Sequence, residues 1–185
     1  MSSQTKEKIY LLIIVLLIAL CGQFYYSYRY LPKQQREISV YYNQERELNK
    51  EIINEIRDAD KFVYFAVYTF TRSDIKDALL AAKYRGLNVI GLTDRDQYQK
   101  LESQQKIIDE LKKSGIPVYV QDHSGIMHLK VVVTEKAYAS GSYNWTASAT
   151  NINDEVLEVG RDETLRSTFQ KILEEMFAKY SPTTR

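Results

Sequence analysis

The stretch on which the fold assignment depends is Met127-His128-Leu129-Lys130-Val131-Val132-Val133-Thr134-Glu135. The sequence predicts a strand from His128 to Thr134. Because alternate side chains of a strand point to the same face, we expect His128 and Lys130 to project together. An imidazole beside a fixed ammonium group suits attack on a phosphorus atom, since the lysine can stabilise charge on the phosphoryl oxygens.

Two segments downstream of this strand add polar groups. In Gly141-Ser142-Tyr143-Asn144 the glycine allows a tight turn, and the hydroxyl and amide are uncharged donors for phosphate oxygens. Further on, Glu155 is expected to accept a hydrogen bond from the far imidazole nitrogen of His128 and so to determine its tautomer. Each feature alone occurs often by chance, whereas the ordered set is much rarer.

The elements around this strand alternate between strand and helix before a final group of strands. Strands are predicted at residues 38–42, 61–70, 87–93, 116–120, 128–134, 136–141 and 156–160, and helices at 45–58, 73–84, 96–113 and 163–180, with Ser73 as a helix cap. We see no internal repeat. This order predicts an α/β fold, in which a mixed β-sheet is flanked by helices on both faces.

Residues 1–28 differ from the rest of the chain. Lys6 and Lys8 precede an apolar run from Ile9 to Cys21 that contains no charge. Extending the run to residue 28 brings it to about the twenty residues of a membrane-spanning helix, with aromatic residues at the far end. We therefore expect residues 9–28 to contact a membrane.

Two interpretations of this N-terminal segment stay open. An uncleaved membrane anchor is favoured over a cleavable signal peptide, for which Ala19-Leu20-Cys21 loosely fits the cleavage pattern. In both cases a polar tether at residues 29–37 leads to a catalytic domain at residues 38–180. That domain is expected outside the cytoplasm, on the periplasmic or extracellular face.

Composition limits the chemistry. The 185 residues suffice for one compact domain with a small appendage. The single cysteine, Cys21, excludes an intrachain disulfide and a multi-cysteine zinc site. The two histidines, His123 and His128, could form a multi-histidine metal site only with the help of several carboxylates. A mechanism without metal or cofactor is therefore the expectation. Beyond residue 28 basic and acidic residues are equal in number, so a polyanion would need a local positive patch.

Taken together, His128-x-Lys130, the acid Glu135, Gly141-Ser142-x-Asn144 and Glu155 resemble the HKD motif of the phospholipase D superfamily. The set is most similar to the small single-motif members, the bacterial Nuc-type endonucleases. The likeness extends upstream through Ala66 to Thr71 and covers roughly residues 38–178. It implies the phospholipase D/nuclease-like fold.

The resemblance also implies roles for these residues. His128 would be the nucleophile that forms a phosphohistidine, and Glu155 would orient it. The phosphoryl oxygens would be bound by Lys130, Ser142 and Asn144. Glu135 departs from the family pattern, which has aspartate at this position. In the family that acid supports the motif more than the chemistry, so we expect activity to survive the change.

A single motif has a consequence for assembly. The family's reaction needs two histidines, one to attack and one to protonate the leaving oxygen. His123 has no lysine partner and is expected in a loop, so the second His128 should come from a second subunit. This predicts a twofold homodimer with the active site across its interface. Two opposed His128 and Lys130 pairs would also form the local positive patch.

Three functions follow from these residues. The leading hypothesis is an endonuclease of low sequence specificity that acts on DNA, with RNA as a further substrate class, because no base-reading element is evident. The alternative is a phospholipase of the same superfamily, such as a cardiolipin hydrolase. The third is a nucleic-acid-binding module that keeps the fold but has lost catalysis through Glu135. Trp145 is interpreted as a packing residue in preference to a base-stacking one.

Overall fold

The computed structural model describes residues 3–30 and 37–181. The chain separates into one unit at residues 1–35 and a second at residues 36–185. Most of the polar tether expected at residues 29–37 falls on residues 31–36, which lie outside the described residues.

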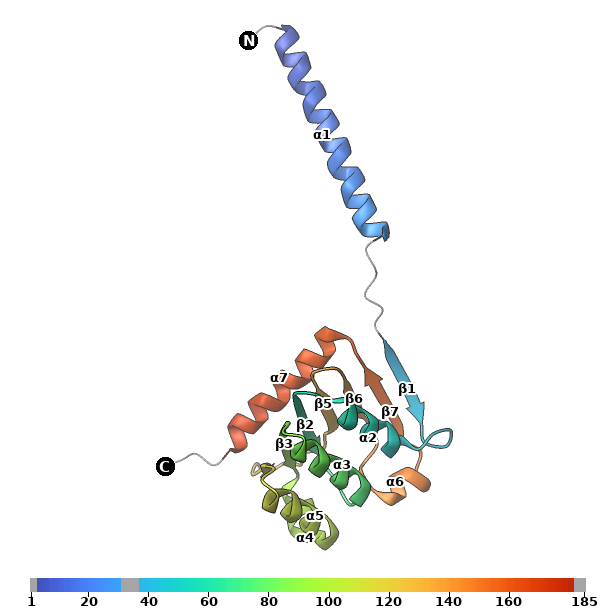
Figure 1. The fold of residues 1–185 in the computed structure, drawn as a ribbon, viewed down its shortest axis with the longest axis vertical. Helices are drawn as coiled ribbons and strands as arrows, with labels where there is room; N and C mark the ends of the chain where they lie inside the picture. Colours follow the sequence, from blue (N-terminus) through green and yellow to red (C-terminus); the bar gives the residue numbers. More distant parts are fainter. Residues whose placement is uncertain (1–2, 31–36, 182–185) are drawn as a thin grey trace. The chain divides into compact units, whose positions relative to one another are not determined.

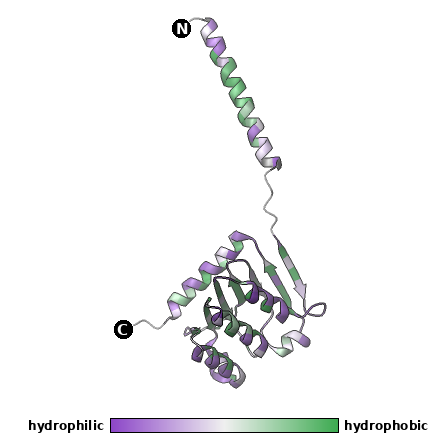
Figure 2. Cartoon of the chain, in the orientation of Figure 1, coloured by the Kyte–Doolittle hydropathy of each residue, from purple (hydrophilic) through white to green (hydrophobic). Residues whose placement is uncertain are grey.

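The first unit is one long helix, α1, at Ser3–Tyr30. Within it, Gln4–Ser27 is long and apolar enough to cross a membrane, and the side chains of that stretch are not buried against protein. Figure 2 shows hydrophobic residues concentrated along the middle of this helix. Since a signal sequence has the same length and hydropathy, anchor and signal peptide both stay predictions.

The second unit is built on one mixed sheet of seven strands (Figure 1). The strands are β1 Ile38–Tyr42, β2 Phe62–Val67, β3 Asn88–Thr93, β4 Val118–Val120, β5 Lys130–Thr134, β6 Tyr138–Gly141 and β7 Val156–Gly160, in the spatial order β1-β7-β6-β5-β2-β3-β4. The strands β2, β3 and β4 are parallel, and every other pairing is antiparallel. The predicted mixed sheet is confirmed.

Helices cover both faces of the sheet. They are α2 Leu48–Asp58, α3 Ser73–Tyr84, α4 Arg95–Lys100, α5 Glu102–Lys113, α6 Ala147–Asn151 and α7 Glu163–Tyr180. One apolar cluster joins α2, α3 and α5 to the sheet and includes Val132, whereas α7 packs on a second cluster with Val131 and Val133. This alternation along β5 follows from the two-residue period of a strand. It confirms the predicted helices on both faces (Figure 1).

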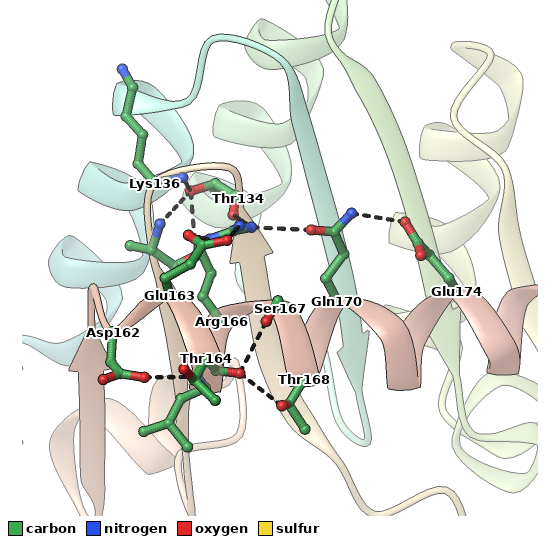
Figure 3. Close-up of polar contacts among 12 residues, drawn as sticks. Thr134, Lys136, Asp162, Glu163, Thr164, Arg166, Ser167, Thr168, Gln170 and Glu174 are labelled. Atoms are coloured by element: carbon green, nitrogen blue, oxygen red, sulfur yellow. Dashed lines mark hydrogen bonds and ion pairs between the residues drawn. The ribbon is translucent and has the colours of Figure 1, made fainter. Parts of the chain in front are cut away.

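The start of α7 is attached to the end of β5 through Arg166. This side chain is 8% exposed, and its guanidinium donates to the carbonyl oxygen of Thr134 at 3.3 Å and to Glu163 and Gln170. Figure 3 shows Arg166 reaching from the helix toward Thr134. Asp162 caps the same helix by accepting from the backbone N–H of Leu165 at 2.9 Å. These bonds fix the start of α7 at Glu163, which is the residue that the sequence predicted.

Two local expectations are wrong, and one helix was not predicted. Residues 96–113 form two helices, because Leu101 takes an extended backbone (φ −109, ψ 99) and Gln104 then turns inward to bond the chain after β2. Ser73 is the first helical residue of α3 and not its cap, a position that Arg72 occupies. The short helix α6 follows a cap by Thr146 that the sequence analysis missed.

Gly141 at the end of β6 has no room for a side chain beside β7. A Cβ atom added there would lie 2.1 Å from the carbonyl oxygen of Val156 on β7. We therefore predict that Gly141→Ala lowers the free energy of unfolding by about 1–3 kcal/mol, measured by urea denaturation. The control is Ser140→Ala on the same strand, which should change stability little. Equal stability of Gly141→Ala and the unchanged protein would contradict the packing described here.

Candidate active site

The candidate residues gather at one edge of the sheet. Because β5 is antiparallel to both β2 and β6, the start of β5 lies beside the ends of β2 and β6, and β7 begins next to the end of β6. At this edge lie His128 and Lys130 at the start of β5, Tyr68 after β2, Ser142 and Asn144 after β6, and Glu155 before β7.

His128 is an exposed side chain just outside the sheet. The strand β5 begins at Lys130, two residues later than predicted, so His128 lies in the preceding loop. Its imidazole meets the ring of Tyr68 edge-on, with centroids 4.7 Å apart and an interplanar angle of 62°. The imidazole is therefore accessible to solvent and packs on one side against an aromatic ring.

Lys130 is the buried partner of this imidazole. Its side chain is 6% exposed, and its Nζ lies 5.2 Å from the Tyr68 ring centroid and donates to the backbone oxygen of His128 at 2.9 Å. Burial lowers the pKa of Lys130, whereas the negative charge of Glu155 acts in the opposite direction. The side chains of His128 and Lys130 therefore both contact the Tyr68 ring, in keeping with the expectation that they lie close together.

Glu155 is buried beside Ser142. Its carboxylate accepts hydrogen bonds from the Ser142 hydroxyl and from the Asn153 amide, the latter at 3.1 Å. Its negative charge raises the pKa of Lys130 against the effect of burial. Among the described residues no hydrogen bond joins Glu155 to His128, so its role in orienting the imidazole stays a prediction.

Ser142 is correspondingly a positioning group. Its hydroxyl donates to Glu155, and its oxygen accepts from the backbone N–H of Val156 at 3.2 Å. Because the one hydroxyl proton is directed at the carboxylate, Ser142 has no second proton for a phosphate oxygen. In this arrangement Ser142 supports Glu155, and its predicted role as a donor to a phosphate oxygen stays a prediction.

Asn144 and Trp145 connect this edge to the end of β2. The Asn144 side-chain oxygen accepts from the backbone N–H of Thr69 at 3.3 Å, so its amide nitrogen is the group left to donate. Trp145 is 1% exposed and packs against Phe65 and Phe70. The interpretation of Trp145 as a packing residue is confirmed.

Asn43, after β1, is a site residue that the sequence analysis missed. Its side-chain oxygen accepts from the backbone N–H of Glu155 at 3.0 Å, and its amide donates to the carbonyl oxygens of Ala149 and Asn153. It thereby holds the loop that presents Glu155. No signal in the sequence identified it, because the two residues are 112 positions apart and meet only through the β1–β7 pairing.

Glu135 lies at the opposite end of β5, about 15 Å along the strand from Lys130. Its carboxylate accepts from the backbone N–H groups of Asp60, Lys61 and Phe62, at 2.8, 3.2 and 3.4 Å. Glu135 therefore lies apart from His128 and Lys130 and caps the start of β2. Its place in the catalytic set stays a prediction.

His123 lies in the predicted loop, where its Nδ1 accepts from the backbone N–H of Gly125 at 2.9 Å. Across residues 3–30 and 37–181, no three His, Cys, Asp or Glu side chains form a group suited to a metal ion.

Comparisons with known proteins agree with the resemblance found in the sequence. Residues 52–177 match a family model described as cardiolipin synthase, PLD-like domain. The mitochondrial cardiolipin hydrolase of Xenopus tropicalis is 30% identical over 125 residues, 67% of this chain, and the phospholipase D of Rickettsia conorii is 31% identical over 121 residues, 65% of this chain. This chain spans 58% and 59% of the lengths of these two relatives.

Two solved structures have the same fold. Nuc from Salmonella typhimurium, a phospholipase D family member, superposes with a TM-score of 0.71 at 26% identity and covers 76% of this chain and 93% of its own. NucT from Helicobacter pylori superposes with a TM-score of 0.71 at 25% identity and covers 78% of this chain and 97% of its own.

The Glu135 cap yields a prediction about acid stability. Burial opposes ionisation of Glu135, but the backbone N–H groups of Asp60, Lys61 and Phe62 outweigh it and lower its pKa. A lowered pKa means that the stabilisation is complete above about pH 4.3, the unfolded value, and is lost as pH falls through the folded value. Glu135→Gln should therefore cost about 1 kcal/mol at neutral pH and progressively less in acid.

Urea denaturation over a pH series measures this difference. The matched control is Glu175→Gln at an exposed position on α7, which should leave the pH profile unchanged. A Glu135→Gln deficit that stays constant as the pH is lowered would show that the carboxylate charge does not provide the stabilisation.

Proposed function

The chain belongs to the phospholipase D superfamily, and on that premise we propose that it is a metal-independent endonuclease acting on DNA, with RNA as a further substrate class. The observation that carries the proposal is the exposed His128 imidazole held beside the buried Lys130 ammonium group around one tyrosine ring. A nucleophile next to a charge in a low-dielectric site is the arrangement that attack on a phosphodiester requires.

The proposed reaction has two steps. In the first, a ring nitrogen of His128 bonds to phosphorus, and the bond from phosphorus to the leaving oxygen breaks. A second imidazole gives its proton to that oxygen. In the second, this imidazole takes a proton from water, the water oxygen bonds to phosphorus, and the phosphorus–nitrogen bond breaks. Lys130 and the Asn144 amide stabilise the charge that develops on the non-bridging oxygens.

The second imidazole is proposed to be His128 of another copy of the chain. His128 lies at the exposed edge of the sheet, and His123 is directed to its own loop backbone. A twofold axis beside His128 would bring two imidazoles to one phosphorus atom and place two Lys130 groups around it. This arrangement would concentrate positive charge in a domain whose composition is neutral.

The choice of a nucleic acid rests on the resemblance to single-motif Nuc-type endonucleases and on the match to Nuc and NucT over nearly their whole lengths. We further propose that α1 anchors the chain or exports it, so that residues 38–180 act outside the cytoplasm. The second candidate function is hydrolysis of a phospholipid. The curated relatives named cardiolipin hydrolase and a helix able to span a membrane favour it.

Plasmid nicking in the presence of EDTA tests the leading proposal. We expect the full chain in detergent to convert supercoiled DNA to the nicked form. We also expect His128→Ala to lower that rate by at least about 10³-fold, because the covalent step loses its nucleophile. His123→Ala is the matched control and should keep the rate.

Two results would contradict the proposed mechanism or the proposed substrate. A requirement for added divalent metal would contradict the imidazole mechanism. Release of phosphatidic acid from cardiolipin vesicles, without DNA cleavage, would assign the same site to lipid.

Mixing unchanged chains with His128→Ala chains tests the shared site. If each site needs both imidazoles, only dimers of two unchanged chains are active. Under free subunit exchange, equal mixing should then reduce the rate to about one quarter of that of the undiluted unchanged protein at the same total concentration. A reduction to about one half would indicate that each chain acts alone. Exchange is verified by mass spectrometry of isotope-labelled dimers.

A further inference from the structure

Asp94, directly after β3, is a carboxylate that the proposed reaction does not use. Its side chain is fully buried. Its Oδ1 accepts from the backbone N–H of Gln97 at 2.9 Å, and its Oδ2 accepts from the Gln121 amide at 3.1 Å and from the backbone N–H of Met127 at 2.9 Å. All three donors are neutral. Burying a carboxylate costs free energy unless hydrogen bonds compensate for the lost water. These three bonds therefore allow Asp94 to be buried.

The two carboxylate oxygens serve different segments. The bond from Gln97 caps α4, which needs only Oδ1. The bonds at Oδ2 come from Gln121, which directly follows β4, and from Met127, in the loop that leads to β5. Asp94 therefore joins the end of β3, the end of β4 and the loop that carries the nucleophile.

Its bond to Met127 restrains the backbone next to His128. On the other side, the carbonyl oxygen of Leu129 accepts from the backbone N–H of Tyr68 at 2.8 Å. His128 has no strand pairing of its own because β5 begins at Lys130. The position of the imidazole therefore depends on these two flanking bonds, on the bond from Lys130 Nζ to the His128 backbone oxygen, and on the Tyr68 ring.

We propose that Asp94 is a positioning residue for catalysis: its Oδ2 restrains the backbone at Met127 and so aims the His128 imidazole at phosphorus. The inference rests on the proposed role of His128 as the nucleophile. Asp94 does not touch the reacting atoms, and its effect passes through one peptide group. Attack by a nucleophile is sensitive to displacements of this kind, because a shift of about 1 Å lowers rates by about a hundredfold.

Asp94→Asn removes the bond from Met127. Asparagine caps a helix as well as aspartate does, so Oδ1 can keep the bond from Gln97. The new Nδ2 is a donor and cannot accept from Met127. Gln121 Nε2 donates both to Asp94 and to the carbonyl oxygen of Gly125, at 3.1 Å each. If the Gln121 amide rotates so that Oε1, which has no partner among the described atoms, accepts from the new Nδ2, the bond to Gly125 is lost. The substitution therefore loosens the loop that carries His128 at Met127 and leaves the helix cap in place.

Asp162→Asn is the matched control. Asp162 also caps a helix, through the backbone N–H of Leu165 at 2.9 Å, but that helix is α7, and the bond is remote from the His128 loop. Asp94→Asn and Asp162→Asn are therefore the same chemical change at two caps, of which only one also contacts the loop.

The experiment measures hydrolysis of bis(p-nitrophenyl) phosphate, a phosphodiester that is neither lipid nor nucleic acid, by the full chain in detergent. We expect kcat of Asp94→Asn to fall between about tenfold and a hundredfold, with KM within about twofold, while Asp162→Asn matches the unchanged protein. Hydrogen exchange gives a second readout. The Met127 amide should exchange at least about tenfold faster in Asp94→Asn, and the amide of Val132 in β5 should not change.

The possible outcomes distinguish the positioning role of Asp94 from the proposed function. If the unchanged protein is active, His128→Ala is inactive and Asp94→Asn keeps full activity, the positioning role is wrong and the proposed function stands. Equal losses in Asp94→Asn and Asp162→Asn, or faster exchange at Val132, would also overturn the positioning role in favour of a general loss of structure. If His128→Ala is as active as the unchanged protein, or neither hydrolyses the ester, the proposed function fails and the positioning role fails with it.

Discussion

The pairing of β2 with β5 is the interaction on which the rest of the site depends. These strands lie at the centre of the sheet, and their antiparallel register sets Val67 opposite Lys130. Tyr68 therefore follows β2 at the point where the loop before β5 arrives, and its backbone N–H binds Leu129. One register thus delivers the aromatic ring, the imidazole and the ammonium group to the same edge. A slip of one residue would turn Lys130 to the other face of the sheet.

Burial gives this edge its electrostatic character. Lys130 is almost fully buried, and Glu155 is buried at the start of the neighbouring strand β7. A charge in a low-dielectric environment interacts more strongly with a substrate phosphate than the same charge in water. Ser142 and Asn153 are neutral partners that keep the Glu155 carboxylate in place. Lys130 Nζ donates to the backbone oxygen of His128, and no ion pair to it is seen within residues 3–30 and 37–181. The exposed imidazole is thus backed by a positive group that solvent does not screen.

The candidate site of one chain holds one imidazole, His128, and one ammonium group, Lys130, whereas a two-step displacement needs an acid as well as a nucleophile. Glu155 illustrates why the missing component is sought in a second copy. Within one chain its carboxylate accepts from the Ser142 hydroxyl, so we expect any direct pairing with an imidazole to form across an interface. The fold supports such an arrangement because His128 lies at the accessible edge and not beneath a helix.

The sequence by itself determined the order of the strands, the bounds of β1 and β7, and the family, because local periodicity and short motifs are encoded by neighbouring residues. It also identified His128 and Lys130. Only the tertiary structure decided which polar groups meet. Asn43 reaches Glu155, and Asp94 reaches Met127, from 112 and 33 positions away. It also separated Glu135 from the site, because the two ends of one strand lie at opposite edges of the sheet. Side-chain partners at such distances follow from strand order and register, which no local pattern specifies.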